Sequence, residues 1–394
     1  MTDAAEWLEE LRERGLHRQL RLIEGPQGPT VTLDGRPVLL LCSNNYLGLA
    51  DRAEVREAAA EAALRWGAGA GASRLISGNM EPHRQLESRL AAFKGCEAAL
   101  LFGSGYLANT GVIAALAGRG AVVLSDELNH ASIVDGCRLS RAETVVYRHG
   151  DVEHLAWCLR QAGGRAALIV SDGVFSMDGD VAPLPELLEL ARRHGARLMV
   201  DEAHATGAIG PGGRGSVAAA GLSGEVDVVV GTLGKALGSY GACACASAET
   251  IELLVNAARP FIFSTAPPPS AAAAALAALG ILEAEPELVE RLQANAETLR
   301  AALGDEGLDV GRSATQIIPL EVGAAARTME LCERALQRGV FAQGVRPPTV
   351  PEGASRLRFT VMATHRPREL TAAARKVGAA TRELGLVEPQ SLAA

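Results

Sequence analysis

The chain has 394 residues, enough for about two to three domains of ~150 residues each. Hydrophobic residues make up 48% of it and charged residues 21%, a balance typical of soluble globular proteins. Its formal net charge of −8 argues against a nucleic-acid partner, because a phosphate backbone requires a basic protein face. The N-terminus is acidic where a signal peptide would be basic. The longest apolar run, Ala271–Leu282, is shorter than the roughly 20 residues that span a bilayer. We therefore expect a cytoplasmic protein that binds neither nucleic acid nor membrane.

The seven cysteines do not show the spacing of a metal site. None of them forms a C-x-x-C pair, and Cys243 and Cys245 lie inside an apolar, alternating stretch. A metal site or a disulfide is the less favoured alternative. In a reducing cytosol such residues are usually buried free thiols, so we expect no metal.

The N-terminal segment predicts a helix followed by a hairpin. Apolar residues recur at helical spacing over residues 4–24, and a Gly- and Pro-rich break follows. Two short apolar runs, 31–33 and 38–41, then flank Asp34-Gly35. That dipeptide favours a tight hairpin turn.

From about residue 55 to 246, short apolar runs alternate with helical segments. One such segment, Leu184–Arg193, begins at prolines and ends before Gly195. Runs buried on both faces and separated by helices indicate a mainly parallel sheet with helices on both sides. In such sheets the reactive groups gather at the carboxyl ends of the strands. The seven runs are Ala98–Phe102, Ala121–Ser125, Thr144–Tyr147, Ala166–Ser171, Arg197–Val200, Val226–Thr232 and Gly241–Ala246.

The pattern changes towards the C-terminus. A long helix is predicted over about 270–303, and a second one near 327–338, between apolar runs at Ile317–Val322 and Arg356–Val361. This arrangement predicts a smaller α+β domain. The expected division is an N-terminal segment 1–45, a large α/β domain 46–285 and a small C-terminal domain 286–394.

One apolar strand ends abruptly in Asp201-Glu-Ala-His204. A carboxylate at that place is costly to bury unless it meets a cation. A protonated pyridine nitrogen is a suitable partner, because the carboxylate then keeps the ring an electron sink. A helix-capping Asp201 with a solvent-facing His204 is the alternative for this motif alone. A helicase box is excluded because the chain has no G-x-x-x-x-G-K-[ST] loop.

Another apolar strand leads into Lys235, which is flanked by glycines. A lysine that leaves a buried strand in a glycine-rich turn suits a desolvated amine that forms an imine. The alternative is a surface lysine in a flexible turn. This chain otherwise uses arginine for positive charge and has two further lysines, Lys94 and Lys376, which raises the weight of the functional interpretation.

Two further motifs follow strands of the same predicted sheet. The backbone N–H groups of Gly105 and Tyr106 open a helix and form a ready anion site, to which the Thr232 hydroxyl can add. His130 is placed to stack on a flat ring, although a capping or core histidine is the commoner case. A G-x-G-x-x-G pattern over 210–215 does not join a strand to a helix, so it does not indicate a dinucleotide site.

Taken together, these residues resemble the α-oxoamine synthase family of fold-type-I pyridoxal-phosphate (PLP) enzymes over nearly the whole chain. Pro347–Gly353 and the following Arg356–Thr360 favour the members that act in biotin biosynthesis. The other segments that carry the resemblance are Ser43–Leu49, Ser73–Asn79, Asp126–Ser132, Asp172–Asp180, Asp201–His204 and Gly231–Leu237.

The resemblance implies a role for each matching residue in cofactor binding. Lys235 is the Schiff-base lysine and the proton-transfer base, Asp201 pairs the pyridinium, and His204 bonds the phenolic oxygen. His130 stacks on the ring. The remaining implied cofactor contacts are Gly105, Tyr106, Thr232, Ser176 and, reaching the phosphate of the other subunit of a homodimer, Thr265.

The resemblance also implies the substrates. Asn44 and Arg358 would bind the amino-acid carboxylate, which Arg grips bidentately, and Arg21 and Thr349 would contact the acyl substrate. The implied reaction is the decarboxylative condensation of L-alanine with a pimeloyl thioester, carried by CoA or by acyl carrier protein. Alternatives are glycine C-acetyltransferase, which joins glycine to acetyl-CoA, other α-oxoamine synthases, and a non-catalytic PLP-binding regulatory protein.

Overall fold

The computed structural model describes residues 3–386, which divide into two compact units. The large unit comprises residues 49–176 and 181–289. The small unit comprises the described residues up to 48, the short segment 177–180 and the described residues from 290 onward. The N-terminal segment and the C-terminal part of the chain therefore share one unit. The finer division at residues 45 and 285 stays a prediction.

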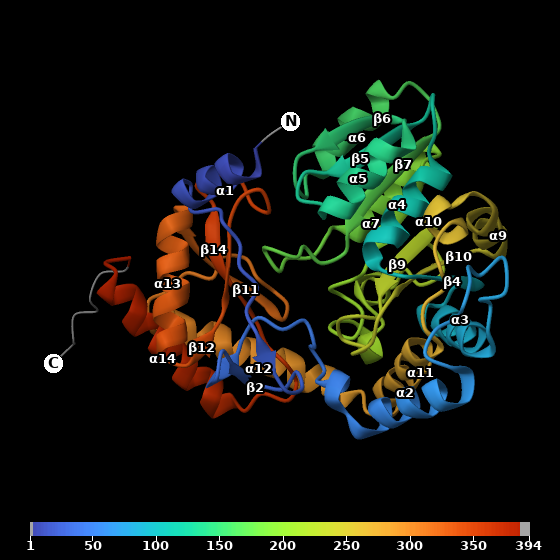
Figure 1. Cartoon of the computed structure of the whole chain (residues 1–394). Coiled ribbons are helices and arrows are strands. Elements are labelled where there is room, and N and C mark those ends of the chain that lie inside the picture. The colour runs from blue at the N-terminus through green and yellow to red at the C-terminus, as the bar shows by residue number, and fades with distance from the viewer. Residues whose placement is uncertain (1–2, 387–394) are drawn as a thin grey trace. The chain divides into compact units, whose positions relative to one another are not determined.

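The large unit is built on a seven-stranded sheet in the order β4-β10-β9-β8-β7-β5-β6 (Figure 1). All its strands run parallel except β10, which is antiparallel to both of its neighbours. This confirms the predicted α/β class and the mainly parallel sheet. The strands are β4 (Ala98–Phe102), β5 (Val122–Asp126), β6 (Glu143–Tyr147), β7 (Ala167–Asp172), β8 (Arg197–Asp201), β9 (Val228–Thr232) and β10 (Ala242–Ala246).

Helices cover both faces of this sheet because side chains alternate along each buried strand. Val123 packs in one core with α4 (Gly105–Leu116), α5 (Ala131–Ser140), α9 (Ala248–Ala257) and α10 (Arg259–Ile262). Its neighbours Val122 and Leu124 pack in the other core, with α6 (Val152–Gln161), α7 (Leu184–His194) and α8 (Ser216–Ala219). Outside these layers, α2 (Ala53–Trp66) and α3 (Glu81–Lys94) pack against α11 (Pro269–Ala284).

The small unit contains two sheets. Strands β1 (Ile23–Glu24), β2 (Thr30–Leu33), β3 (Arg36–Leu40) and β12 (Val340–Phe341) form one. Strands β11 (Ile317–Gly323), β14 (Ser355–Thr360) and β13 (Gln343–Val345) form the antiparallel second one. Its helices are α1 (Ala4–Glu13), α13 (Ala325–Gln337), α14 (Pro367–Glu383) and most of α12 (Glu287–Asp305). The predicted hairpin is confirmed: Asp34 and Gly35 join β2 to β3 with φ angles of 47° and 78°.

Two helices were predicted to be longer than the structure shows. The N-terminal helix ends at Glu13 instead of continuing to residue 24, because Gly15 has a left-handed φ of 65°; Leu20, which was expected on its apolar face, is fully exposed. The helix expected over 270–303 is broken into α11 and α12 between Glu285 and Glu287, where Pro286 interrupts helical hydrogen bonding. Over residues 3–386, no helix is both long and apolar enough to cross a membrane. The seven cysteines are free thiols.

Candidate active site

Most of the functional residues predicted in the large unit follow strands that end at one edge of its sheet. Strands β4, β5, β7, β8 and β9 all point their carboxyl ends to this edge. Three of the strands end there in a carboxylate, namely Asp126, Asp172 and Asp201. The buried strands end in polar residues here because the sheet stops at this edge. The strand ends then lie next to a layer of polar loops.

Lys235 lies in the glycine-rich turn between β9 and β10, and its amine meets His204. The Nζ atom of Lys235 is 2.8 Å from Nε2 of His204, which follows β8. His204 is buried, whereas Lys235 is half-buried. The sequence therefore located both members of a contact that joins segments 31 residues apart.

Asp201 is held firmly at the end of β8. The residue is 4% exposed. Its Oδ2 accepts a hydrogen bond from Asn109 Nδ2 at 2.6 Å, and its Oδ1 accepts one from the backbone N–H of Ala203 at 2.8 Å. A buried carboxylate with both oxygens in hydrogen bonds keeps a fixed orientation.

Asp172 adds a second buried carboxylate beside Asp201. The two residues are partners in the register of β7 and β8, and Asp172 Oδ2 accepts a hydrogen bond from the backbone N–H of His130 at 2.8 Å. Burial, and after it repulsion from Asp201, raises the pKa of Asp172 well above its ordinary value. The raised pKa favours the neutral form of Asp172, which leaves Asp201 as the carboxylate of this pair to meet a cationic group.

His130 caps the start of α5 and is tied to the strand ends. Its Nδ1 accepts a hydrogen bond from the backbone N–H of Ser132 at 3.2 Å and lies 2.7 Å from the Ser132 hydroxyl oxygen. Partial desolvation lowers the pKa of the imidazole, although the residue keeps solvent contact; Asp201 opposes this effect and Lys235 adds to it. The ring is therefore neutral at ordinary pH.

The predicted phosphate turn lies at the start of α4. Ser104 caps this helix by accepting a hydrogen bond from the Leu107 N–H, and the next two residues are Gly105 and Tyr106. The Tyr106 hydroxyl donates to Asp135 at 2.6 Å, so its backbone N–H is the group left for an anion. Thr232 ends β9, where its hydroxyl donates to the Gly241 carbonyl oxygen at 3.2 Å.

Two other predicted cofactor contacts also lie in the large unit. Ser176 is buried after β7, and exposed Thr265 forms an isolated bridge with Ser73. The roles of both residues stay predictions.

The predicted substrate residues all belong to the small unit. Arg358 is 7% exposed on β14 and hydrogen-bonds to Tyr46, whose hydroxyl donates to Asn44 Oδ1 at 3.1 Å. The structure thus brings Asn44 and Arg358 together around one tyrosine. Burial raises the pKa of Tyr46 above its ordinary value, so the hydroxyl stays protonated.

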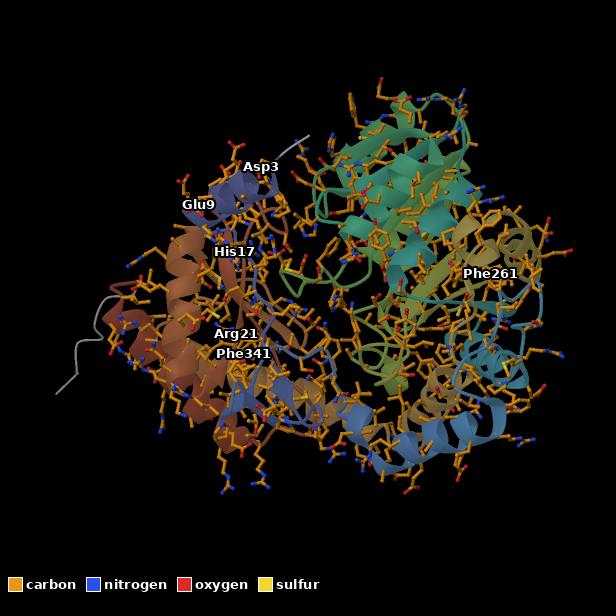
Figure 2. All side chains as sticks on the ribbon, viewed as in Figure 1. Asp3, Glu9, His17, Arg21, Phe261 and Phe341 are labelled. Atoms are coloured by element: carbon orange, nitrogen blue, oxygen red, sulfur yellow. The ribbon has the colours of Figure 1, made fainter. Side chains whose placement is uncertain are left out.

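Arg21 and Thr349, the other substrate pair, line one cavity of about 650 Å³ in the small unit. Figure 2 labels His17, Arg21 and Phe341 among its lining side chains. Arg21 forms an ion pair with Glu333 there.

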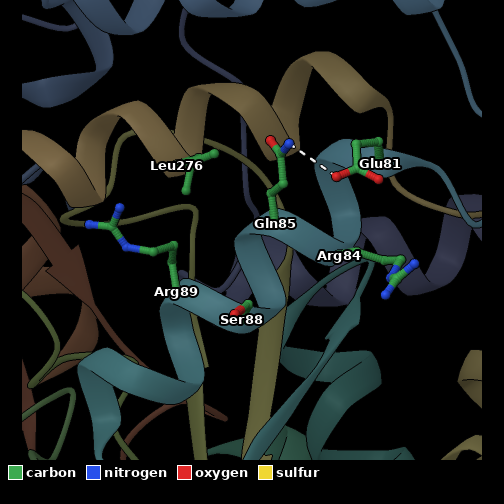
Figure 3. A pocket seen from close by; sticks show the side chains of 6 residues that line it. All are labelled: Glu81, Arg84, Gln85, Ser88, Arg89 and Leu276. Carbon is green, nitrogen blue, oxygen red and sulfur yellow. Dashed lines mark hydrogen bonds between the residues drawn. The ribbon is translucent and has the colours of Figure 1, made fainter.

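A second cavity, of about 550 Å³, lies between α3 and α11 in the large unit and holds none of the predicted site residues (Figure 3). On the α3 side of its lining, Gln85 donates to Glu81 at 3.1 Å. The lining consists of Glu81, Arg84, Gln85, Ser88, Arg89 and Leu276.

Sequence patterns did not identify Asn109 and Ser132 as site residues. Asn109 is 1% exposed on α4, four residues after Gly105 and therefore on the same helical face. Its amide bridges Asp201 and the Ser132 hydroxyl. The helical spacing from Gly105 was the one available signal for Asn109. Ser132 was only part of a longer motif.

The turn that carries Lys235 depends on Gly238. This residue has a φ of 59°, and a Cβ atom placed on it would lie 2.3 Å from the Ala50 nitrogen. We expect Gly238→Ala to lower the free energy of unfolding by about 1–3 kcal/mol, measured as a lower melting temperature. Gly234→Ala is the matched control, because its Cβ would meet nothing closer than 3.5 Å. Equal melting of the two variants would contradict the close approach.

Comparisons with known proteins give the class first. The family model described as aminotransferase class I and II matches residues 36–377, and the chain belongs to this family. In structure it is similar to serine palmitoyltransferase from S. paucimobilis with a bound PLP–myriocin aldimine, with a TM-score of 0.93, 34% identity and coverage of 97% of this chain and 98% of that one. This confirms the fold class.

The curated relatives are more specific. The chain is 53% identical over 390 residues to the 8-amino-7-oxononanoate synthase of Citrifermentans bemidjiense, covering 98% of this chain and 100% of the relative. It is 54% identical over 384 residues to that of Geobacter sulfurreducens, covering 96% and 98%. A solved 8-amino-7-oxononanoate synthase from Francisella tularensis matches with a TM-score of 0.76 and 26% identity over 88% of this chain and 99% of that one. These similarities confirm the predicted enzyme class, a decarboxylating acyltransferase.

Proposed function

We propose that this chain condenses L-alanine with a pimeloyl thioester, with loss of carbon dioxide, using PLP as its cofactor. The observation that carries the proposal is full-length identity above 50% to 8-amino-7-oxononanoate synthases, together with the contact between Lys235 and His204 beside Asp201. The structural similarity to a PLP-bound serine palmitoyltransferase supports the cofactor.

The residues at the sheet edge fit this cofactor. Asp172 and Asp201 are adjacent buried residues, and burial, followed by the charge of Asp201, raises the pKa of Asp172. A pyridinium nitrogen facing Asp201 would balance this negative charge. The start of α4 at Gly105 supplies backbone N–H groups for a phosphate, and Thr232 supplies a hydroxyl.

PLP, when bound, would supply an electron sink for the negative charge that develops when the amino acid loses its Cα proton. Lys235 Nζ would hold the cofactor covalently, and the same amine is the base that would accept the Cα proton of the amino acid. His204 Nε2 lies 2.8 Å from that amine and orients it, and the same imidazole would hold the phenolic oxygen of the cofactor. Asp201, fixed by Asn109 and the Ala203 N–H, would keep the ring nitrogen of the cofactor protonated.

The small unit supplies the substrate contacts in this proposal. Arg358, supported by Tyr46, binds the carboxylate of L-alanine together with Asn44. Arg21 and Thr349 contact the acyl substrate, and the cavity that they share supports this assignment. The carrier of the pimeloyl group is CoA or acyl carrier protein.

The proposal extends to assembly and location. The enzyme is a homodimer in which Thr265, an exposed residue, reaches the phosphate of the other subunit. It works in the cytoplasm.

The deciding experiment compares three substrate pairs on the purified, PLP-loaded chain. We expect kcat/KM for L-alanine with pimeloyl-CoA to exceed that for glycine with acetyl-CoA, or for L-serine with palmitoyl-CoA, by about 100-fold. Carbon dioxide and free-thiol release are measured together, because the reaction produces one of each. Faster turnover of either of the other pairs would overturn the substrate assignment. A separate arm with the pimeloyl group on acyl carrier protein identifies the carrier.

A further inference from the structure

A continuous hydrogen-bond chain joins His130 to Asp201 at the base of the active site. It runs from the His130 imidazole to the Ser132 hydroxyl at 2.7 Å, from there to the Asn109 amide at 2.8 Å, and from the amide to Asp201 at 2.6 Å. Ser132 and Asn109 are both 1% exposed. This hydrogen-bond chain links two helices and the end of a strand. The position of each hydrogen in it follows from the chemistry of its donors and acceptors.

The two ends of the hydrogen-bond chain, His130 and Asp201, each have groups that can act in one way only. The backbone N–H of Ser132 points at His130 Nδ1 at 3.2 Å, and a backbone N–H can only donate. Nδ1 therefore carries a lone pair and no proton. At the other end, the Asp201 carboxylate can only accept, so the Asn109 group at 2.6 Å from it is the NH₂ group.

The middle of the chain then follows. One N–H of Asn109 donates to Asp201, and the other donates to the Ser132 hydroxyl oxygen. Since that oxygen accepts from Asn109, its own proton is directed to Nδ1 of His130. Asn109 Oδ1 is buried with no hydrogen bond among residues 3–386, which fits an amide used for its donor side.

We propose that Ser132 and Asn109 are positioning residues that hold His130 in the neutral tautomer protonated on Nε2, so that the ring offers the site a hydrogen-bond donor. Both hydrogen bonds into Nδ1 would be lost if that nitrogen gained a proton, so they oppose the imidazolium form. The tautomer of His130 can be measured whether or not the proposed function is correct. Its effect on turnover rests on that function.

The charged groups around His130 act on the same equilibrium. Asp201 on β8 favours the imidazolium, Lys235 in the turn after β9 disfavours it, and Asp172 on β7 accepts the His130 backbone N–H. The α4 residue in the chain is the neutral Asn109. These charged groups are unchanged in a Ser132 variant. A change in the pKa of His130 in that variant therefore measures the effect of the Ser132 hydroxyl.

The test is ¹⁵N NMR of histidine-labelled protein with and without PLP, with His130→Gln used to assign the signal. We expect the Nδ1 resonance of His130 to be that of an unprotonated ring nitrogen. Ser132→Ala should raise the pKa of the imidazole by about half to one unit, because one donor to the neutral form is worth about that much. Asn109→Ala should shift it less, in the same direction.

Ser140→Ala is the matched control. Ser140 is a buried serine of the same helix, and its hydroxyl donates to the Cys137 carbonyl oxygen at 2.7 Å. It should leave the His130 titration unchanged. A protonated Nδ1 in the wild type would overturn the proposal, as would an unshifted His130 in a folded Ser132→Ala protein whose melting temperature alone has fallen. In the turnover assay, the acid limb of kcat/KM should move up by the same shift; a wild type without turnover tests the proposed function and leaves the NMR result intact.

Discussion

Lys235→Ala is expected to abolish covalent attachment of PLP and to lower turnover by more than about 10³-fold. The amine of Lys235 both holds the cofactor and moves the substrate proton in the proposed mechanism, and loss of a positioned base alone costs about 10²–10⁴-fold. Borohydride reduction of the loaded protein, followed by peptide mass analysis, measures the attachment. The chain has three lysines, so the labelled residue is identified directly.

The control for this variant is Lys376→Ala. Lys376 is exposed on α14 in the small unit and should keep both wild-type labelling and turnover. Labelling of Lys94 or Lys376 in the wild type, or a Lys235→Ala enzyme that retains a tenth of the activity, would show that Lys235 is not the cofactor lysine.

Sequence alone predicted the parts of the fold that rest on local patterns. Each of the seven runs in the large unit became a strand within one or two residues, because long apolar runs between turn residues have few other stable conformations. Asp201, at the end of β8, was proposed as a site residue for a related reason: a polar group at the end of an apolar strand needs a partner. His204 and Lys235 were proposed from the turns that follow β8 and β9, and the structure brings these two side chains into contact. The helix ends at Glu13 and Ala284 were missed because helical periodicity continues past a glycine or a proline that stops the backbone.

Local sequence patterns did not predict which distant residues form hydrogen bonds with one another. The hydrogen-bond chain through Asn109 and Ser132 joins residues 23 and 92 positions apart. Helical spacing from Gly105 pointed to Asn109 alone, and no local signal indicated that Asn109 and Ser132 are hydrogen-bond partners. Glu202 appeared in the sequence only as part of the motif that begins at Asp201, and Lys94 only as one of three lysines. In the structure these two residues form an ion pair.

Lys94 and Glu202 form a buried ion pair next to Asp201 at the end of β8. The Glu202 side chain is 0% exposed and that of Lys94 3%. The Lys94 amine also donates to the Thr206 hydroxyl at 2.8 Å and to the Arg214 carbonyl oxygen at 2.7 Å. Glu202 Oε1 accepts from the Ser216 hydroxyl at 2.9 Å and from the backbone N–H of residue 217 at 2.7 Å. The pair therefore ties the end of α3 to the loop that follows Asp201.

Lys94→Met is expected to destabilise the protein by about 3–5 kcal/mol, because it leaves a carboxylate buried without its cation. Lys94→Met combined with Glu202→Gln should recover more than half of that loss, since no bare charge remains. Thermal and urea unfolding measure both. Arg52→Met provides the comparison: Arg52 pairs with Glu285 while both side chains are about a third exposed, so its loss should cost less than about 1 kcal/mol. If Lys94→Met cost no more than Arg52→Met, the loop after Asp201 would be held by its backbone hydrogen bonds and not by the ion pair.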